Sequence, residues 1–98
     1  MDVEFRNREL RHLAERADYL GKYPPEVIRA YRRRIQLIRS AASELDIYAM
    51  RSNHYEKLKG NRSHQKSIRL NDQWRLIVET VAGSRKDTIR VVDIEDYH

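Results

Sequence analysis

Positive charge gathers in one stretch of this 98-residue sequence, from His54 to Arg75. The stretch carries six basic side chains and only two acidic ones, Glu56 and Asp72. The basic residues are Lys57, Lys59, Arg62, Lys66, Arg69 and Arg75. Side chains of this kind bind phosphate groups, and several on one sheet face can hold a nucleic-acid backbone. The stretch therefore predicts a phosphate-binding surface, with a solvated face of surface ion pairs as the alternative.

A second group of reactive side chains ends the sequence, where Asp96, Tyr97 and His98 follow one another. Histidine moves protons near neutral pH, and tyrosine stacks on a base or donates a hydrogen bond. RNA cleavage without a metal requires activation of the 2′-hydroxyl, stabilisation of charge on the phosphate and protonation of the leaving oxygen. The basic side chains suit the second task, and His98, Tyr97 or a loop histidine suits the first or third. The alternative is a frayed, inactive terminus.

The composition of the chain favours a basic cytoplasmic domain. A net charge of +5 and a pI near 9.7 attract polyanions such as RNA or DNA. The absence of cysteine excludes disulfides and thiolate zinc sites, and the four histidines are scattered without an acidic cluster. We therefore expect no metal and no cofactor. No apolar run is long enough to span a membrane, and the first residues lack the order of a signal peptide.

The first half of the sequence predicts two helices. Asn7 is a suitable cap for a helix over residues 7–19, where apolar side chains recur with helical spacing. Pro25 opens a second helix that runs to about residue 42, because proline is favourable in the first helical turn. One face of the second helix is apolar and the other is basic. The apolar face holds Val27, Tyr31, Ile35, Ile38 and Ala42, and the other face holds Arg29, Arg32, Arg33, Gln36 and Arg39.

The second half of the sequence predicts an antiparallel meander, because branched and aromatic residues alternate with polar ones. Residues 66–70 and 73–81 flank a turn signal at Asn71-Asp72 and predict a hairpin, and residues 88–94 predict a third strand. Helices followed by a meander indicate an α+β fold, here as one domain over residues 1–98.

Shorter segments leave alternatives open. Residues 3–5 are weakly strand-like, and residues 43–51 suit either a helical turn or an extended crossing. Residues 52–66 indicate a loop, with a short strand before it as an alternative. Within the hairpin, alternation places Ser67 and Arg69 on one face, and the turn brings Arg75 near Arg69.

Three motifs in the same order resemble the HigB branch of the RelE/ParE toxins. They are Leu58-Lys59-Gly60-Asn61-Arg62, then Ser67-Ile68-Arg69-Leu70-Asn71-Asp72-Gln73-Trp74-Arg75, then Asp96-Tyr97-His98. The resemblance implies a RelE-like fold with two N-terminal helices packed on a small, mainly antiparallel sheet. It also implies the toxin of a type II toxin–antitoxin pair, a ribosome-dependent endoribonuclease that cuts mRNA in the A site. The implied partners are the ribosome, mRNA and a HigA-type helix-turn-helix antitoxin, the last in a hetero-oligomer.

The resemblance also implies roles for single residues. Lys59, Arg69 and Arg75 match basic positions that hold the mRNA backbone or stabilise the transition state. At the end of the chain His98 would transfer a proton, Tyr97 would orient or stack on the substrate, and Asp96 would position its neighbours. Further RNA contacts are expected from Lys57, Arg62, Lys66 and His54.

The chain departs from the family pattern at one position. Some members carry a catalytic histidine three residues ahead of the motif lysine, where this chain has Glu56. His54 lies two residues earlier. Glu56 could act as the base, or ribosomal RNA could supply part of the chemistry.

Two other functions remain as alternatives. A ParE-like inhibitor of DNA gyrase would keep the fold without nuclease groups, although the Asp96-Tyr97-His98 ending argues against it. A non-catalytic RNA- or protein-binding module would use the arginine face of the second helix.

Overall fold

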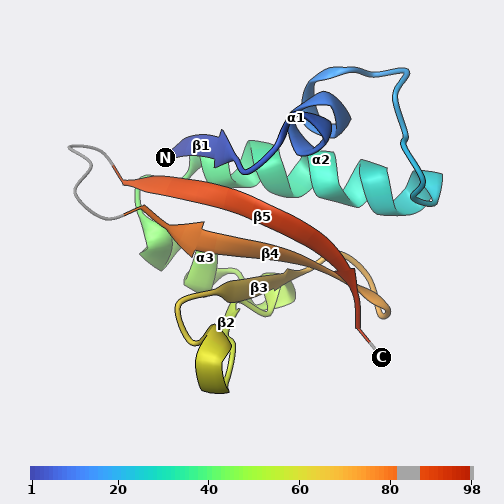
Figure 1. The fold of residues 1–98 in the computed structure, drawn as a ribbon. Helices are drawn as coiled ribbons and strands as arrows, with labels where there is room; N and C mark the ends of the chain where they lie inside the picture. Colours follow the sequence, from blue (N-terminus) through green and yellow to red (C-terminus); the bar gives the residue numbers. More distant parts are fainter. Residues whose placement is uncertain (82–86, 98) are drawn as a thin grey trace.

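A five-stranded sheet organises the computed structural model, which describes residues 1–81 and 87–97 (Figure 1). The strands are β1 (Asp2–Phe5), β2 (Glu56–Lys57), β3 (Lys66–Arg69), β4 (Trp74–Thr80) and β5 (Thr88–Asp96). Their order in the sheet is β1-β5-β4-β3-β2. β1 runs parallel to β5, and the other neighbours are antiparallel. The predicted α+β fold with a mainly antiparallel sheet is therefore confirmed.

Helices pack on one face of this sheet. The described residues form α1 (Arg8–Glu15), α2 (Pro25–Ser40) and α3 (Glu44–Ala49), with short 3-10 turns η1 (Arg51–Asn53) and η2 (Gly60–Arg62). Figure 1 shows α2 running alongside the sheet next to β1 and β5. One hydrophobic core joins the three helices to the strands. None of the described helices is long and apolar enough to cross a membrane.

The start of each N-terminal helix follows the sequence prediction. The Asn7 side chain caps α1, because its Oδ1 accepts a hydrogen bond of 2.9 Å from the amide of Leu10. Pro25 is the first residue of α2, where its missing N–H costs nothing. The ends differ from prediction, since α1 stops at Glu15 and α2 at Ser40.

Arg32 was predicted on the basic face of α2, and its side chain is directed to α1. Its guanidinium donates hydrogen bonds of 2.7–3.3 Å to four carbonyl oxygens at and beyond the end of α1. These carbonyls belong to Leu13, Arg16, Ala17 and Tyr19. The helix that was predicted to continue to residue 19 therefore ends early, with its open carbonyls bound by a neighbouring helix.

The hairpin of β3 and β4 is built as predicted. Asn71 Oδ1 accepts hydrogen bonds from the amides of Gln73 (2.9 Å) and Trp74 (2.8 Å), which closes the turn. Trp74 packs against the core and meets the Tyr23 ring edge-on at 5.7 Å. Ile68 is buried beneath the helices, so the residues next to it in β3 face the other way.

Candidate active site

A row of three charged residues crosses the outer face of the sheet, the face turned away from the helices. Arg69 on β3 lies directly opposite Arg75 on β4, and Arg75 lies directly opposite Glu95 on β5. Directly opposed residues share a face, and like charges placed in this way destabilise a sheet. An anion bound between Arg69 and Arg75 would relieve the repulsion, so the row suits a phosphate ligand.

Arg75 stacks on the Tyr97 ring, with 4.6 Å between the guanidinium carbon and the ring centre. Its Nη1 donates hydrogen bonds to the carbonyl oxygens of Asn71 (2.7 Å) and Trp74 (3.2 Å). A cation over an aromatic ring is stabilised by about 0.5–1 kcal/mol at exposed sites. Within the described residues Arg75 forms no ion pair with a carboxylate. Contacts with the described residues thus fix the position of the guanidinium without pairing it to a carboxylate.

Arg69 in this row and Arg62 beside it are both paired with carboxylates. Arg69 forms an ion pair with Asp72 of the hairpin turn. Arg62, at the end of η2, binds both oxygens of Glu95 through Nη1 and Nη2 at 3.2 and 2.8 Å. The hydrogen bonds that Arg62 donates to Glu95 raise the pKa of Arg62. Of the three arginines, Arg75 is thus the one best placed to bind an external anion.

A pocket of about 420 Å³ opens beside Tyr97 on this outer face. Its lining residues are Leu58, Arg62, Ser67, Ile77, Glu95, Asp96 and Tyr97. The volume lies within the usual range for small-ligand sites. Glu56 points to the same side, because it is paired with Ser67 across β2 and β3.

The end of β5 is held by the hairpin turn. The Asp96 carboxylate accepts a hydrogen bond of 3.0 Å from the Gln73 side-chain amide, and the Tyr97 amide donates to the Gln73 carbonyl. The frayed-terminus alternative is therefore wrong for Asp96 and Tyr97. His98 lies outside the described residues.

Two of the predicted RNA-binding lysines lie on the opposite face. Lys66 precedes Ser67 in β3, and Lys57 is paired with Lys66, so both side chains point away from Arg75. The Lys66 ammonium group forms an ion pair with Glu44 of α3 and lies over the rings of Tyr48 and Tyr55. Burial acts to lower the pKa of Lys66, but its hydrogen bonds to Glu44 and Tyr48 outweigh burial and raise it.

The remaining predicted contacts lie in the segment between α3 and β3. Lys59 is exposed and immediately precedes η2, and η2 is joined to β5 by the Arg62–Glu95 pair. His54 is exposed at the end of η1 with a left-handed backbone (φ 44°). Its side chain forms no hydrogen bond, ion pair or ring contact with the described residues.

Comparison with known proteins decides the family. The family model described as RelE-like toxin of type II toxin–antitoxin system HigB matches residues 3–98. The chain belongs to the HigB-like toxin family. Toxin HigB-1 of Vibrio cholerae serotype O1 (strain ATCC 39315 / El Tor Inaba N16961) is 31% identical over 88 residues. That alignment covers 90% of this chain and 93% of the relative.

The fold of this HigB-like toxin is shared by a solved structure. The YoeB/ParE toxin from Agrobacterium tumefaciens superposes with a TM-score of 0.60 over the full length of both chains, at 14% sequence identity. The likeness confirms a RelE-like fold. Membership of a toxin–antitoxin family also implies an antitoxin as partner.

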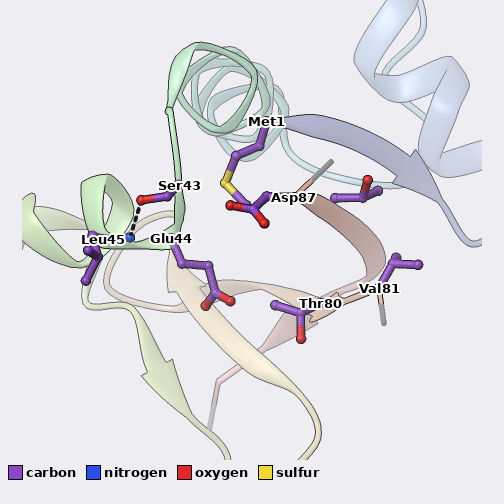
Figure 2. A pocket seen from close by; sticks show the side chains of 8 residues that line it. Met1, Ser43, Glu44, Leu45, Thr80, Val81 and Asp87 are labelled. Carbon is purple, nitrogen blue, oxygen red and sulfur yellow. Dashed lines mark hydrogen bonds between the residues drawn. The ribbon is translucent and has the colours of Figure 1, made fainter. Parts of the chain in front are cut away.

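A different pocket in this HigB-like toxin lies at the far end of β4 and β5 (Figure 2). It measures about 280 Å³ and is lined by Met1, Ser43, Glu44, Leu45, Thr80, Val81, Asp87 and Thr88. Figure 2 shows the acidic side chains of Glu44 and Asp87 at this pocket, and none of the predicted site residues line it. The Glu44 carboxylate is already paired with Lys66, and none of the side chains that line this pocket is basic, so the pocket does not suit a phosphate ligand.

Glu95 is the site residue of this HigB-like toxin that the sequence reading missed. The signal was available, because Glu95 lies in β5 two positions before Tyr97, and alternation continued past the end of the strand would place both on one face. What the sequence did not provide was the bulge between Ile77 and Val78, which sets the register of β4 against β5.

Proposed function

We propose that this HigB-like toxin is an endoribonuclease that inhibits translation by cutting mRNA in the A site of the ribosome, without a metal. The observation that carries the proposal is the Arg75 guanidinium, stacked on Tyr97 and free of a carboxylate partner among the described residues. Arg69 stands opposite it on the same face. Two opposed cations beside a pocket favour a phosphodiester and stabilise the charge that develops on it during cleavage.

The chemistry would proceed by attack of the 2′-oxygen on phosphorus. The O2′–P bond forms as the P–O5′ bond breaks, the 2′-hydroxyl proton passes to a base, and O5′ receives a proton from an acid. Arg75 would stabilise the phosphoryl charge, Tyr97 would stack on the substrate, and Asp96 would hold the end of β5. We assign one proton transfer to His98. Glu56, on the same face as Ser67, is the candidate for the other.

The RNA backbone would follow the outer face past Lys59 and Arg69. Lys57 and Lys66 point to the opposite side of the sheet, and His54 stands apart at η1, so the proposal gives them no contact with the scissile phosphate. The proposed antitoxin is a HigA-type helix-turn-helix protein that forms a hetero-oligomer with the toxin. The proposed location is the cytoplasm, where translating ribosomes are present.

Induced expression followed by mapping of mRNA 5′ ends tests the proposal. We expect in-frame cuts within translated codons, and purified toxin should leave free RNA largely intact. Arg75→Ala should lower the rate of cleavage about a hundredfold, as expected for loss of one transition-state donor. Arg11→Ala, at an exposed position on α1, is the matched control.

Intact mRNA in cells that show DNA damage and stalled replication would contradict the proposal and favour gyrase inhibition. Salt-sensitive RNA binding without cleavage or toxicity would instead favour a binding module.

A further inference from the structure

Glu95 has two arginines near it, Arg75 and Arg62. It pairs with Arg62, which lies farther from it along the sequence. In the sheet register it stands directly opposite Arg75. Opposite charges in such cross-strand pairs attract, and a carboxylate is the preferred partner of a guanidinium. The Glu95 carboxylate is nevertheless turned to Arg62, with both oxygens engaged at 3.2 and 2.8 Å.

Arg62 is itself held in place by other contacts. Its Nε donates a hydrogen bond of 3.0 Å to the Gln65 side-chain oxygen, and the Gln65 amide donates to Glu79 at 3.2 Å. All the guanidinium nitrogens of Arg62 are thus engaged on the outer face. A two-pronged contact of this kind fixes the direction of the carboxylate as well as its distance.

The consequence falls on Arg75. With Glu95 turned away, the partners of Arg75 among the described residues are two carbonyl oxygens and the Tyr97 ring, none of which carries a formal charge. A carboxylate on Arg75 would have to be displaced before a phosphate could bind. Because no carboxylate among the described residues binds Arg75, an anion can bind its guanidinium without displacing one.

We propose that Arg62 is a positioning residue that holds Glu95 away from Arg75 and so keeps Arg75 available for the phosphodiester. This inference rests on the proposed RNA cleavage. The positioning role takes the place of the direct RNA contact that was predicted for Arg62. When Arg62 loses its guanidinium, Glu95 turns to its cross-strand neighbour and competes with the substrate for Arg75.

The experiment compares four purified toxins: the wild type, Arg62→Met, Glu95→Gln and the double variant. Their initial rates of mRNA cleavage are measured on programmed ribosomes. Their affinities for a short 2′-O-methyl RNA are measured over a range of salt concentrations. Thermal melting confirms that each variant is folded, and Arg11→Met provides the same loss of charge on α1.

We expect Arg62→Met to lower the rate and RNA affinity about tenfold, a part of what loss of a transition-state donor costs. The double variant should recover to within about threefold of the wild type, because the amide that replaces the Glu95 carboxylate carries no charge to attract Arg75. Glu95→Gln alone should raise RNA affinity by about two- to threefold, since a negative charge beside the phosphate is removed.

If Arg62 and Glu95 serve only to stabilise the fold, the cleavage rates and RNA affinities of the variants follow a different pattern. If Glu95→Gln is as damaging as Arg62→Met and the double variant shows no recovery, the inference is overturned. An active wild type with an inactive Arg75→Ala variant would leave the proposed function intact in that case. If the wild type and Arg75→Ala cleave equally, or neither cleaves, the proposed function itself fails.

Discussion

At the scale of single residues, the contact between Arg75 and Tyr97 joins the basic row to the end of the chain. Tyr97 is 61% exposed, so most of its side chain is open to solvent. The ring is the flat support on which the guanidinium lies. We therefore propose that Tyr97 acts through its ring, by orienting Arg75 and by stacking on a substrate base.

Replacement of Tyr97 separates the ring from its hydroxyl group. Tyr97→Phe keeps the ring and should retain most of the cleavage rate on programmed ribosomes. Tyr97→Ala should lower that rate at least about two- to fivefold, the equivalent of one exposed cation–π contact. If Tyr97→Phe proves as slow as Tyr97→Ala, the hydroxyl group takes part in the chemistry and the role given to the ring is wrong.

The sequence was sufficient to predict that Arg69 and Arg75 lie together on one face of the sheet, and insufficient to predict which face each lysine occupies. Lys57 and Lys66 were grouped with Arg75 because they lie in one run of positive charge. Charge density along a chain does not distinguish the two faces of a sheet. Alternation in β3 does distinguish them, but the two-residue strand β2 is too short for its pattern to be read.

At the scale of elements, the end of α1 depends on a side chain from α2. The Arg32 guanidinium binds four carbonyl oxygens at and beyond the C-terminal end of α1. Helix propensity over residues 7–19 does not reveal this, because the partner lies far along the chain. The predicted strands matched more closely, since their turn signals at Asn71-Asp72 are local.

Arg32→Met should therefore lower the free energy of unfolding by about 2 kcal/mol, the usual cost of losing hydrogen bonds to a charged group. Urea unfolding followed by circular dichroism measures this value. Arg33→Met, at an exposed position on the same helix, should change it by less than about 0.5 kcal/mol. Equal effects of the two substitutions would contradict the capping role of Arg32.

At the scale of the whole molecule, two buried tyrosines lie at points where elements join. The Tyr31 hydroxyl group donates to the Leu10 carbonyl at 2.7 Å and links α2 to α1. The Tyr55 hydroxyl group donates to Glu44 at 3.1 Å and links the segment after η1 to α3. Burial raises the pKa of both phenols above the ordinary value of 10.0, and the charge of Glu44 adds to the effect at Tyr55.

These raised pKa values predict a loss of stability at alkaline pH. Below pH 10 both tyrosines are neutral in the folded and unfolded chain, so they give no pH dependence. Above pH 10 the unfolded chain releases both protons while the folded chain retains them. The free energy of unfolding should then fall by as much as about 2.7 kcal/mol per pH unit from the two groups together.

Urea unfolding from pH 8 to pH 11.5 tests this prediction by comparing slopes between variants. The double variant Tyr31→Phe/Tyr55→Phe should lose most of the slope above about pH 10, although each change costs about 1 kcal/mol of hydrogen bonding at neutral pH. Tyr97→Phe removes an exposed phenol and should keep the wild-type slope. A double variant with an unchanged slope would show that other groups cause the alkaline unfolding, and that the two phenols do not join the helices in the way their burial indicates.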